Sequence, residues 1–232
     1  EVNEGQPIQP RASADISLHG ESPHGAFFEG GLYREIAAFN PVVTRVITDD
    51  AALAPRRREP LFDHPDIWLP ARWSLINQIE TPEETNQRLV VIPAQYQSTT
   101  SEIGTERLFE AMTYTVYYSS TVDIIPPSIW AVEAYQVPGG TQVTVEVTDL
   151  NDVTRVGAAF TLSDGLWETR DLTRSGADPN RWLGMLPQGA ELSWFVQAVD
   201  GAGNVAVTTN KGAYFSTALE RVWLPLVMRS AW

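Results

Sequence analysis

The stretch TQVTVEVTD, residues 141–149, decides the fold. Every second position in its centre is a valine and the positions between are polar: Val143, Val145 and Val147 against Gln142, Thr144, Glu146 and Thr148. Successive side chains of a β-strand point to opposite faces, so this period of two is typical of a strand with one buried face. The stretch therefore predicts a half-buried β-strand.

Similar segments flank this one at near-regular spacing. They are SIWAVEAY before it and, after it, TRVGAAFTL, LWETRDLTR, RWLGML, ELSWFVQAVD and GAYFST. Turn-forming residues such as Ser163, Asp164 and Gly165 separate them. About seven short strands in about 95 residues is the number found in an immunoglobulin-like sandwich. We therefore predict such a sandwich over residues 123–218.

One segment of this region carries a family resemblance. LPQGAELSWFVQAVDGAGNVA, residues 186–206, resembles the fibronectin type III and bacterial immunoglobulin-like pattern: a Pro-Gly turn, a strand ending in Ala-Val-Asp, and a Gly-Asn turn into the last strand. The resemblance implies that Asp200, Gly201, Gly203 and Asn204 form that last turn. The family often has a tyrosine where this chain has Leu192, so its hydrogen-bonded tyrosine corner is not carried over. The resemblance implies a fold and no particular activity.

The first half of the chain also predicts β-structure. Residues 32–49 and 88–120 show alternation, and the clearest run is Met112, Tyr114, Val116 and Tyr118. Pro126 and Pro127 cannot continue a sheet ladder, so we place a domain boundary near residues 121–127. Residues 1–31 are rich in Gly, Pro, Ser and Glu without sustained periodicity, which predicts an extended arm.

The expected architecture is therefore all-β, with two tandem β-sandwich modules. An extended arm covers residues 1–31, and a β-sandwich-like domain covers 32–122. The immunoglobulin or fibronectin III-like sandwich covers 123–218. A hydrophobic C-terminal strand covers 219–232.

Two short segments resemble secreted proteins. RLVVIPAQYQSTTSEIGTERLFEAMTYTVYYS, residues 88–119, resembles a segment of the non-catalytic propeptide region of secreted gingipain-type cysteine peptidases. RVWLPLVMR, residues 221–229, is similar to Leu-Pro-Leu-Val endings of secreted bacterial surface proteins. The chain has no cysteine, so it cannot supply a cysteine nucleophile. The resemblances imply an exported protein with an extracellular or cell-surface location.

Composition limits the classes of partner that we expect. The chain has 16 basic and 29 acidic residues, and its net charge of −13 repels phosphate backbones, so no nucleic-acid partner is expected. The longest apolar run, VWLPLVM, is far below the roughly 18–20 residues that span a bilayer, which predicts no membrane span.

The sequence shows no catalytic constellation. It lacks a G-x-S-x-G elbow, and the adjacent Glu83 and Glu84 would point to opposite faces of a strand. The three histidines are His19, His24 and His64, and the first two fall in the predicted arm, where no rigid element would fix a metal geometry. We therefore expect no enzyme activity and no transition-metal site.

Calcium is the one metal candidate. Two predicted turns offer oxygen ligands of the type that Ca²⁺ prefers: Asp149, Asn151 and Asp152 in one, Asp200 and Asn204 in the other. Neither turn has the spacing of a calcium loop. The same residue types are also those that any turn between strands selects. The expected cofactor is thus none, with calcium as the alternative.

The C-terminal segment is apolar on both faces of a predicted strand. Its candidate assembly residues are Val222, Trp223, Leu224, Leu226, Val227 and Met228. Such a strand needs cover on both sides. It either folds back onto its own chain or adds to a sheet edge of a neighbouring molecule, which is a second copy or another surface protein. The second alternative would allow a head-to-tail polymer.

Three functions follow from these patterns. The first is a non-catalytic exported structural or adhesive cell-surface protein, polymerising into a filament by strand addition through its termini. The second is a non-catalytic accessory region of a larger secreted gingipain-type peptidase. The third is a glycan-binding module that uses exposed tryptophans. Trp182 and Trp194 are predicted core residues, whereas Trp68, Trp130 and Trp167 are the candidates for exposure.

Overall fold

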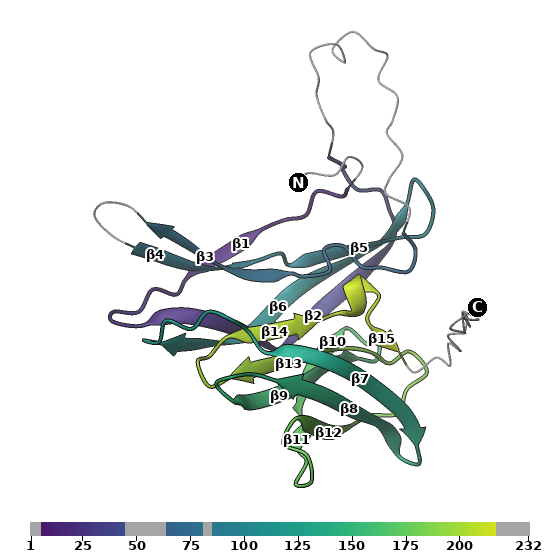
Figure 1. The fold of residues 1–232 in the computed structure, drawn as a ribbon. Helices are drawn as coiled ribbons and strands as arrows, with labels where there is room; N and C mark the ends of the chain where they lie inside the picture. The colour runs from purple at the N-terminus through teal and green to yellow at the C-terminus, as the bar shows by residue number, and fades with distance from the viewer. Residues whose placement is uncertain (1–5, 45–63, 81–84, 217–232) are drawn as a thin grey trace, which may run out of the picture.

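The computed structural model describes residues 6–44, 64–80 and 85–216. Its regular structure is β apart from the short 3-10 turn η2 (Asn210–Gly212), and the strands form three antiparallel sheets stacked in layers (Figure 1). The prediction of an all-β fold is confirmed. The predicted strand of residues 219–232 lies outside the described residues.

The lowest layer in Figure 1 is a four-stranded sheet in the order β11-β12-β8-β7. Its strands are β7 (Ser128–Val137), β8 (Gly140–Thr148), β11 (Thr173–Arg174) and β12 (Arg181–Leu186). Strand β8 contains the valine repeat, and Val143, Val145 and Val147 are all fully buried. The immunoglobulin-like character of this sandwich stays a prediction.

The middle layer is an eight-stranded sheet that joins both halves of the chain. The second half contributes β9 (Val153–Thr161), β10 (Leu166–Asp171), β13 (Ser193–Asp200), β14 (Val205–Thr208) and β15 (Phe215–Ser216). The first half contributes β2 (Ser22–Phe39), β5 (Ala94–Ser98) and β6 (Gly104–Ser119). The join is the ladder between β10 and β2, where Trp167 pairs with Gly31. The boundary predicted near residues 121–127 therefore divides the chain but not this sheet.

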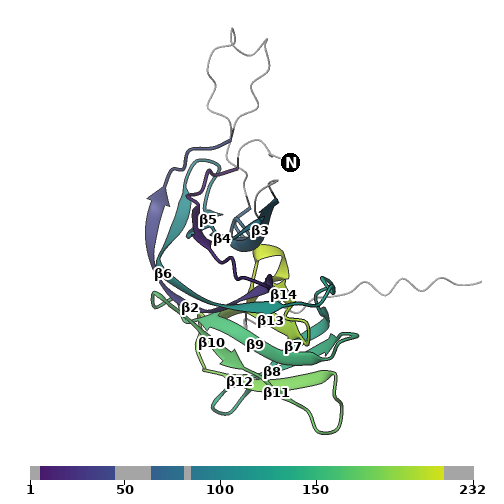
Figure 2. The same ribbon diagram turned by 90° about the vertical axis from the view of Figure 1, so that its left-hand side faces the viewer.

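The third layer covers the middle sheet on the side away from the sandwich (Figures 1 and 2). It contains β1 (Ala12–Asp15), β3 (Ser74–Glu80) and β4 (Thr85–Val91), in the order β1-β4-β3. All three strands come from the first half of the chain. The two predicted modules are thus layered onto one common sheet.

The prediction of an extended arm over residues 1–31 is wrong where the structure places strands in this segment. Strand β1 and the first part of β2 lie within it, and β2 pairs with β6 along most of its length. Glycine and proline suggested a loop, but Gly30 and Gly31 allow close backbone approach. A Cβ atom at Gly30 would lie 2.6 Å from the carbonyl oxygen of Trp167, and one at Gly31 would lie 2.6 Å from that of Ala111.

The middle sheet has a different core on each face. The face toward β7, β8 and β12 buries mostly aliphatic residues: Val143, Val145, Val147, Val153, Val156, Ala158, Leu172, Leu186, Leu192, Val196 and Ala198, together with Phe160, Trp182 and Trp194. The opposite face buries mostly aromatic residues: Phe28, Tyr33, Trp68, Trp73, Phe109, Trp167, Phe195 and Tyr214, with Ala159. The aromatic cluster holds the two halves of the chain together.

The start of β2 crosses the face of the sandwich. A Cβ atom at Gly157 of β9 would lie 2.7 Å from Cζ of Phe27, so the phenyl ring covers this glycine. The backbone N–H of Phe28 donates to Oε1 of Gln197 at 2.8 Å, and Nε2 of Gln197 donates to the carbonyl of Phe28 at 2.9 Å. The Gln197 amide thus pairs with Phe28 as a peptide group of a neighbouring strand would.

No helix in the described residues is long and apolar enough to cross a membrane.

Candidate functional site

Three carboxylates meet at one end of the sandwich. Asp123 lies in the segment before β7, Asp149 follows β8, and Asp200 ends β13. One carboxylate oxygen from each lies within 4.8 Å of the others. The cluster therefore forms where the connection between the two halves meets two turns of the sandwich.

Asn204 ties this connection to the turn after β13. Its Nδ2 donates to the Asp200 carboxylate at 2.8 Å, and also contacts the carbonyl oxygens of Asp123 at 3.2 Å and Ile125 at 3.3 Å. The other oxygen of Asp200 accepts from the backbone N–H groups of Ala202 at 2.9 Å and Asn204 at 2.8 Å. Asp200 is only 2% exposed, and these donors compensate for its burial.

The structure brings together four of the five predicted calcium residues. Asp149 and Asp200 belong to the carboxylate cluster, Asn151 donates to the Asp123 carboxylate, and Asn204 donates to Asp200. The fifth, Asp152, is directed elsewhere.

Asp152 pairs with Arg174, whose Nη2 lies 2.9 Å from its Oδ1. The hydrogen bond from Arg174 is the main reason that the pKa of Asp152 lies below its usual value. Asp152 is thus an ion-pair residue of the turn before β9.

Sequence reasoning missed Asp123. It lies 26 residues before Asp149 and belongs to neither predicted turn. The only signal was its place just before Pro126 and Pro127, in the connection where a boundary was predicted. No periodicity shows that this connection returns to the turns of the sandwich.

The cluster offers the hard oxygen ligands that Ca²⁺ prefers. Carboxylate oxygens come from Asp123, Asp149 and Asp200, whereas Asn151 and Asn204 direct their amide nitrogens at the carboxylates of Asp123 and Asp200. The same carboxylates also accept hydrogen bonds from N–H groups, and these bonds tie the chain locally. The arrangement therefore fits a structural role directly, and calcium stays a prediction.

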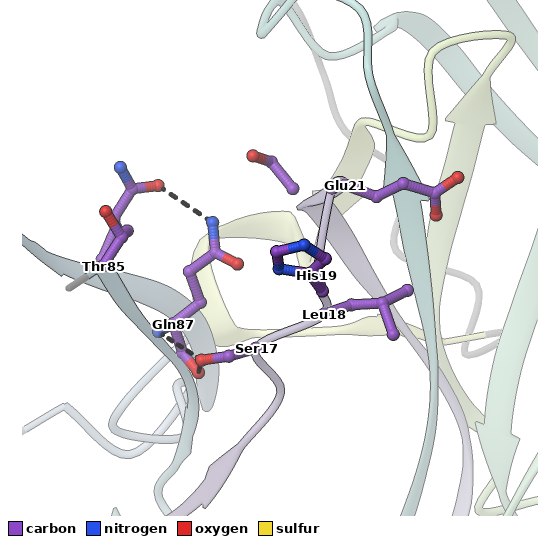
Figure 3. Close-up of a pocket in the computed structure, with 9 residues that line it drawn as sticks. Ser17, Leu18, His19, Glu21, Thr85 and Gln87 are labelled. Atoms are coloured by element: carbon purple, nitrogen blue, oxygen red, sulfur yellow. Dashed lines mark hydrogen bonds between the residues drawn. The ribbon is translucent and has the colours of Figure 1, made fainter.

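A polar cavity of about 490 Å³ lies between the β1–β2 connection and the β3–β4 hairpin. Figure 3 shows the His19 ring between Gln87 and Glu21, with Glu21 directed away from Gln87. The backbone N–H of Gln87 donates to Oγ of Ser17 at 3.0 Å, and its Nε2 donates to Oε1 of Gln78 at 3.3 Å (Figure 3). These hydrogen bonds hold the amide and hydroxyl groups of Gln78, Gln87 and Ser17, which line the cavity together with the imidazole of His19.

The histidines are the candidate ligands for a transition metal. His19 lies in the turn between β1 and β2, and His24 lies within β2, so both belong to ordered β-structure rather than to an arm. Among the residues that the structure describes, none of the histidines belongs to a group of three or more potential metal ligands.

The structure shows which of the five tryptophans singled out in the sequence are buried and which is exposed. Trp68 and Trp167, two candidates for exposure, are 9% and 1% exposed and belong to the aromatic cluster. Trp182 and Trp194 are buried in the sandwich core, as predicted. Trp130 is 73% exposed, on β7. It is therefore the one of the three candidates that can meet a ligand.

The six predicted assembly residues, from Val222 to Met228, lie outside the described residues. Comparisons with protein-family models, with curated proteins and with solved structures found no match. The family resemblances of single segments stay predictions.

Proposed function

We propose that this protein is a non-catalytic, exported structural or adhesive protein of a cell surface, which assembles with further copies by strand addition. The observation that carries the proposal is the eight-stranded sheet shared by both halves of the chain. A sheet that continues through the molecule makes it one stiff body. Stiffness of this kind suits a building block better than a pair of tethered modules.

Partly buried polar contacts across the join support this role. Both terminal nitrogens of Arg155 on β9 bind the Glu29 carboxylate on β2, at 2.6 and 2.9 Å. The guanidinium also lies 3.9 Å from the ring centroid of Phe27. A two-pronged Arg–carboxylate pair with a stacked aromatic ring is directional as well as attractive. It therefore opposes sliding between β2 and the sandwich.

Strand β3 supports assembly because it is an edge strand. It pairs with β4 on one side and has no second strand partner in the described part of the chain. Leu75 and Ile79 are each 48% exposed on one of its faces. Strand β3 contains no proline, lysine or bulge, the devices that commonly protect edges. An added strand would satisfy its free backbone groups and cover both side chains.

The proposed donor strand is the segment containing Val222, Leu224, Leu226 and Met228, which is apolar on both faces in the sequence. The test compares the intact chain with a chain that ends at Thr217, by light scattering after gel filtration and by negative-stain electron microscopy. We expect oligomers or fibres from the intact chain alone. Monomers from both chains would overturn assembly and favour an accessory module of a larger protein.

An edge variant makes the test specific. Replacing both Leu75 and Ile79 with lysine places charge on the β3 edge, and we expect assembly to be lost while the fold is kept. Leu18→Lys is the matched control, because Leu18 is similarly exposed but lies outside β3. Equal assembly of the double variant and the control would reject β3 as the acceptor.

A further inference from the structure

The outer face of the four-stranded sheet carries an unusual set of side chains. The inward residues of β8 are its buried valines, so Thr144, Glu146 and Thr148 point outward. Register places Glu133 of β7 opposite Thr144, and Tyr135 opposite Gln142. These side chains therefore share one solvent-facing surface, which we call the outer sheet face.

Trp130 is the most exposed large aromatic residue of this face. Its side chain is 73% exposed, whereas the other five tryptophans in the described residues are at most 9% exposed. Burying an aromatic side chain stabilises a protein by about 2–3 kcal/mol, so an indole left in water gives up a substantial contribution. A ligand that covers the ring would recover it.

A β-bulge places Trp130 there. Ile129 pairs with Val147 and Ala131 pairs with the adjacent Glu146, so Trp130 is the extra residue in β7. Bulges commonly re-aim a side chain near a functional site. The indole Nε1 donates to Oγ1 of Thr148 at 2.5 Å, which holds the ring on the outer sheet face.

Hydrogen-bonding groups adjoin the ring. Ala131 pairs with Glu146, and Glu146 pairs in turn with Arg181 on β12, whose Nη2 lies 2.8 Å from the Glu146 carboxylate. The small Ala131 side chain leaves this ion pair accessible next to Trp130. The surface beside the indole thus offers both a donor and an acceptor.

A second aromatic ring lies further along the same strand. Tyr135 is 56% exposed, and its hydroxyl donates to the Glu133 carboxylate at 3.2 Å. Ala131 and Tyr135 are four residues apart, which is about 14 Å along an antiparallel strand. Trp130 lies one position beyond Ala131 on the side away from Tyr135, so the two aromatic residues are well separated along the strand. Two separate rings with polar groups between them suit a chain of linked rings better than one small molecule.

We propose that the outer sheet face binds a linear, uncharged polysaccharide. Sugar rings have an apolar C–H face that packs on indole and phenol rings, while their hydroxyls bond with Glu133, Thr144, Glu146 and Arg181. The two carboxylates and the net charge of −13 oppose polyanionic glycans. A stable protein interface would instead need an apolar centre depleted of charge, and here charged groups separate the two rings.

This site names a ligand class for the adhesive part of the proposed function, on which it rests. It depends on β7, β8 and β12 and not on the C-terminal segment. Loss of assembly in the chain that ends at Thr217 therefore leaves this binding unchanged. Conversely, loss of sugar binding in a Trp130 variant leaves assembly unchanged, so the two proposals fail separately.

The test is isothermal titration of the intact chain with four uncharged hexasaccharides: β-1,4-glucan, β-1,3-glucan, β-1,4-mannan and chitin oligomers. We expect saturable binding of at least one. Trp130→Ala should weaken it at least about tenfold, as truncation of an aromatic anchor does. Trp130→Tyr, which keeps a ring, should restore part of the affinity. Tyr135→Ala should weaken binding a few-fold.

Val42→Ala is the control, because Val42 is 73% exposed, as Trp130 is, and lies outside the outer sheet face and outside strand β3. It should bind as the unmodified chain does. Circular dichroism checks that each variant is folded. The inference is overturned if none of the four oligomers binds, if Trp130→Ala binds like the control, or if only a polyanion such as heparin binds. It is also overturned if Trp130→Ala abolishes self-association of the protein without affecting sugar binding.

Discussion

The two faces of the middle sheet are built in different ways. The face toward β7 and β8 packs aliphatic side chains that recur at every second residue, as Val143 and Val145 do. The opposite face packs large rings from distant parts of the chain around Trp73, whose ring centroid lies 5.3 Å from that of Phe28 and 5.5 Å from that of Phe195. The first core is a property of local pattern, and the second is a property of long-range pairing.

The aromatic face also contains pairs of buried polar groups that bond to each other. On the aromatic face Tyr33 and Thr161 share a hydrogen bond of 2.8 Å, and Gln95 and Tyr214 bond in both directions at 2.7 and 3.0 Å. Burial is the main reason that the pKa of Tyr214 lies above its ordinary value, so its hydroxyl stays protonated. A buried polar group is tolerated only with its partner in place, so these pairs favour one arrangement of the layers.

The largest predicted effect is on the free energy of unfolding, and it differs between substitutions in the two cores. Trp73→Ala should lower the free energy of unfolding by about 3–5 kcal/mol, because it leaves a large cavity among five other rings. Val145→Ala removes far less volume from the aliphatic core and should cost about 2 kcal/mol. Urea denaturation measures both. Equal losses would contradict a central role for the aromatic cluster.

The amide of Gln197 is the next point to test. Gln197→Ala leaves the buried N–H of Phe28 without its acceptor, so we expect a loss of about 1–3 kcal/mol. Thr169→Val is the matched control. It removes one donor to the carbonyl of Phe28, which keeps its bond from Gln197, and should cost less. The reverse order in urea denaturation would reject the pairing of this amide with β2.

The calcium hypothesis predicts a smaller effect. Calcium at a tenfold excess over its dissociation constant would stabilise the folded state by about 1.4 kcal/mol, seen as a higher melting temperature than in EDTA. Asp123→Asn should remove the increase, whereas Asp152→Asn should keep it, because Asp152 pairs with Arg174. An unchanged melting temperature would contradict the hypothesis and leave the cluster as a hydrogen-bonded tie. Magnesium is the control ion.

The smallest effect concerns pH. Burial raises the pKa of Glu106 to about 7, against 4.5 ordinarily, and Gln9 donates to its carboxylate at 3.2 Å. Between these two values the folded state holds a proton that the unfolded state has released. Stability should therefore fall as pH rises through 7, by on the order of 1 kcal/mol between pH 6 and pH 8.

Thermal melts of Glu106→Gln check this, since the variant has no carboxyl to ionise and should lose that part of the pH dependence. Glu102→Gln is the control, because Glu102 is exposed in the turn before β6. If the two variants respond to pH alike, Glu106 is not the group responsible.

The sequence predicted the sandwich well because its signals are local. Strand β8 follows from its valines, and the turn at Asp200 and Asn204 follows from its residue types. The join between the two halves of the chain could not be predicted in this way. Gly30 and Gly31 read as loop residues until β10 is placed beside them, and Gln197 reads as an ordinary strand residue until Phe28 lies against it.

The candidate site residues show the same difference between local signals and long-range pairing. Asp149 and Asp200 were found because they lie in recognisable turns, whereas Asp123 depends on a connection that returns from the other half of the chain. The three tryptophan candidates could not be ranked, since exposure depends on which face is covered. The bulge at Trp130 became evident only from the register of β7 against β8.

The central claim is that the two halves of the chain form one body through the shared sheet. Differential scanning calorimetry of the intact chain tests it most directly. We predict a single transition whose calorimetric and van't Hoff enthalpies agree, as all-or-none unfolding requires. Gln197→Ala should shift that transition to lower temperature without splitting it. Two separate transitions in the unmodified chain, one for each half, would contradict the claim.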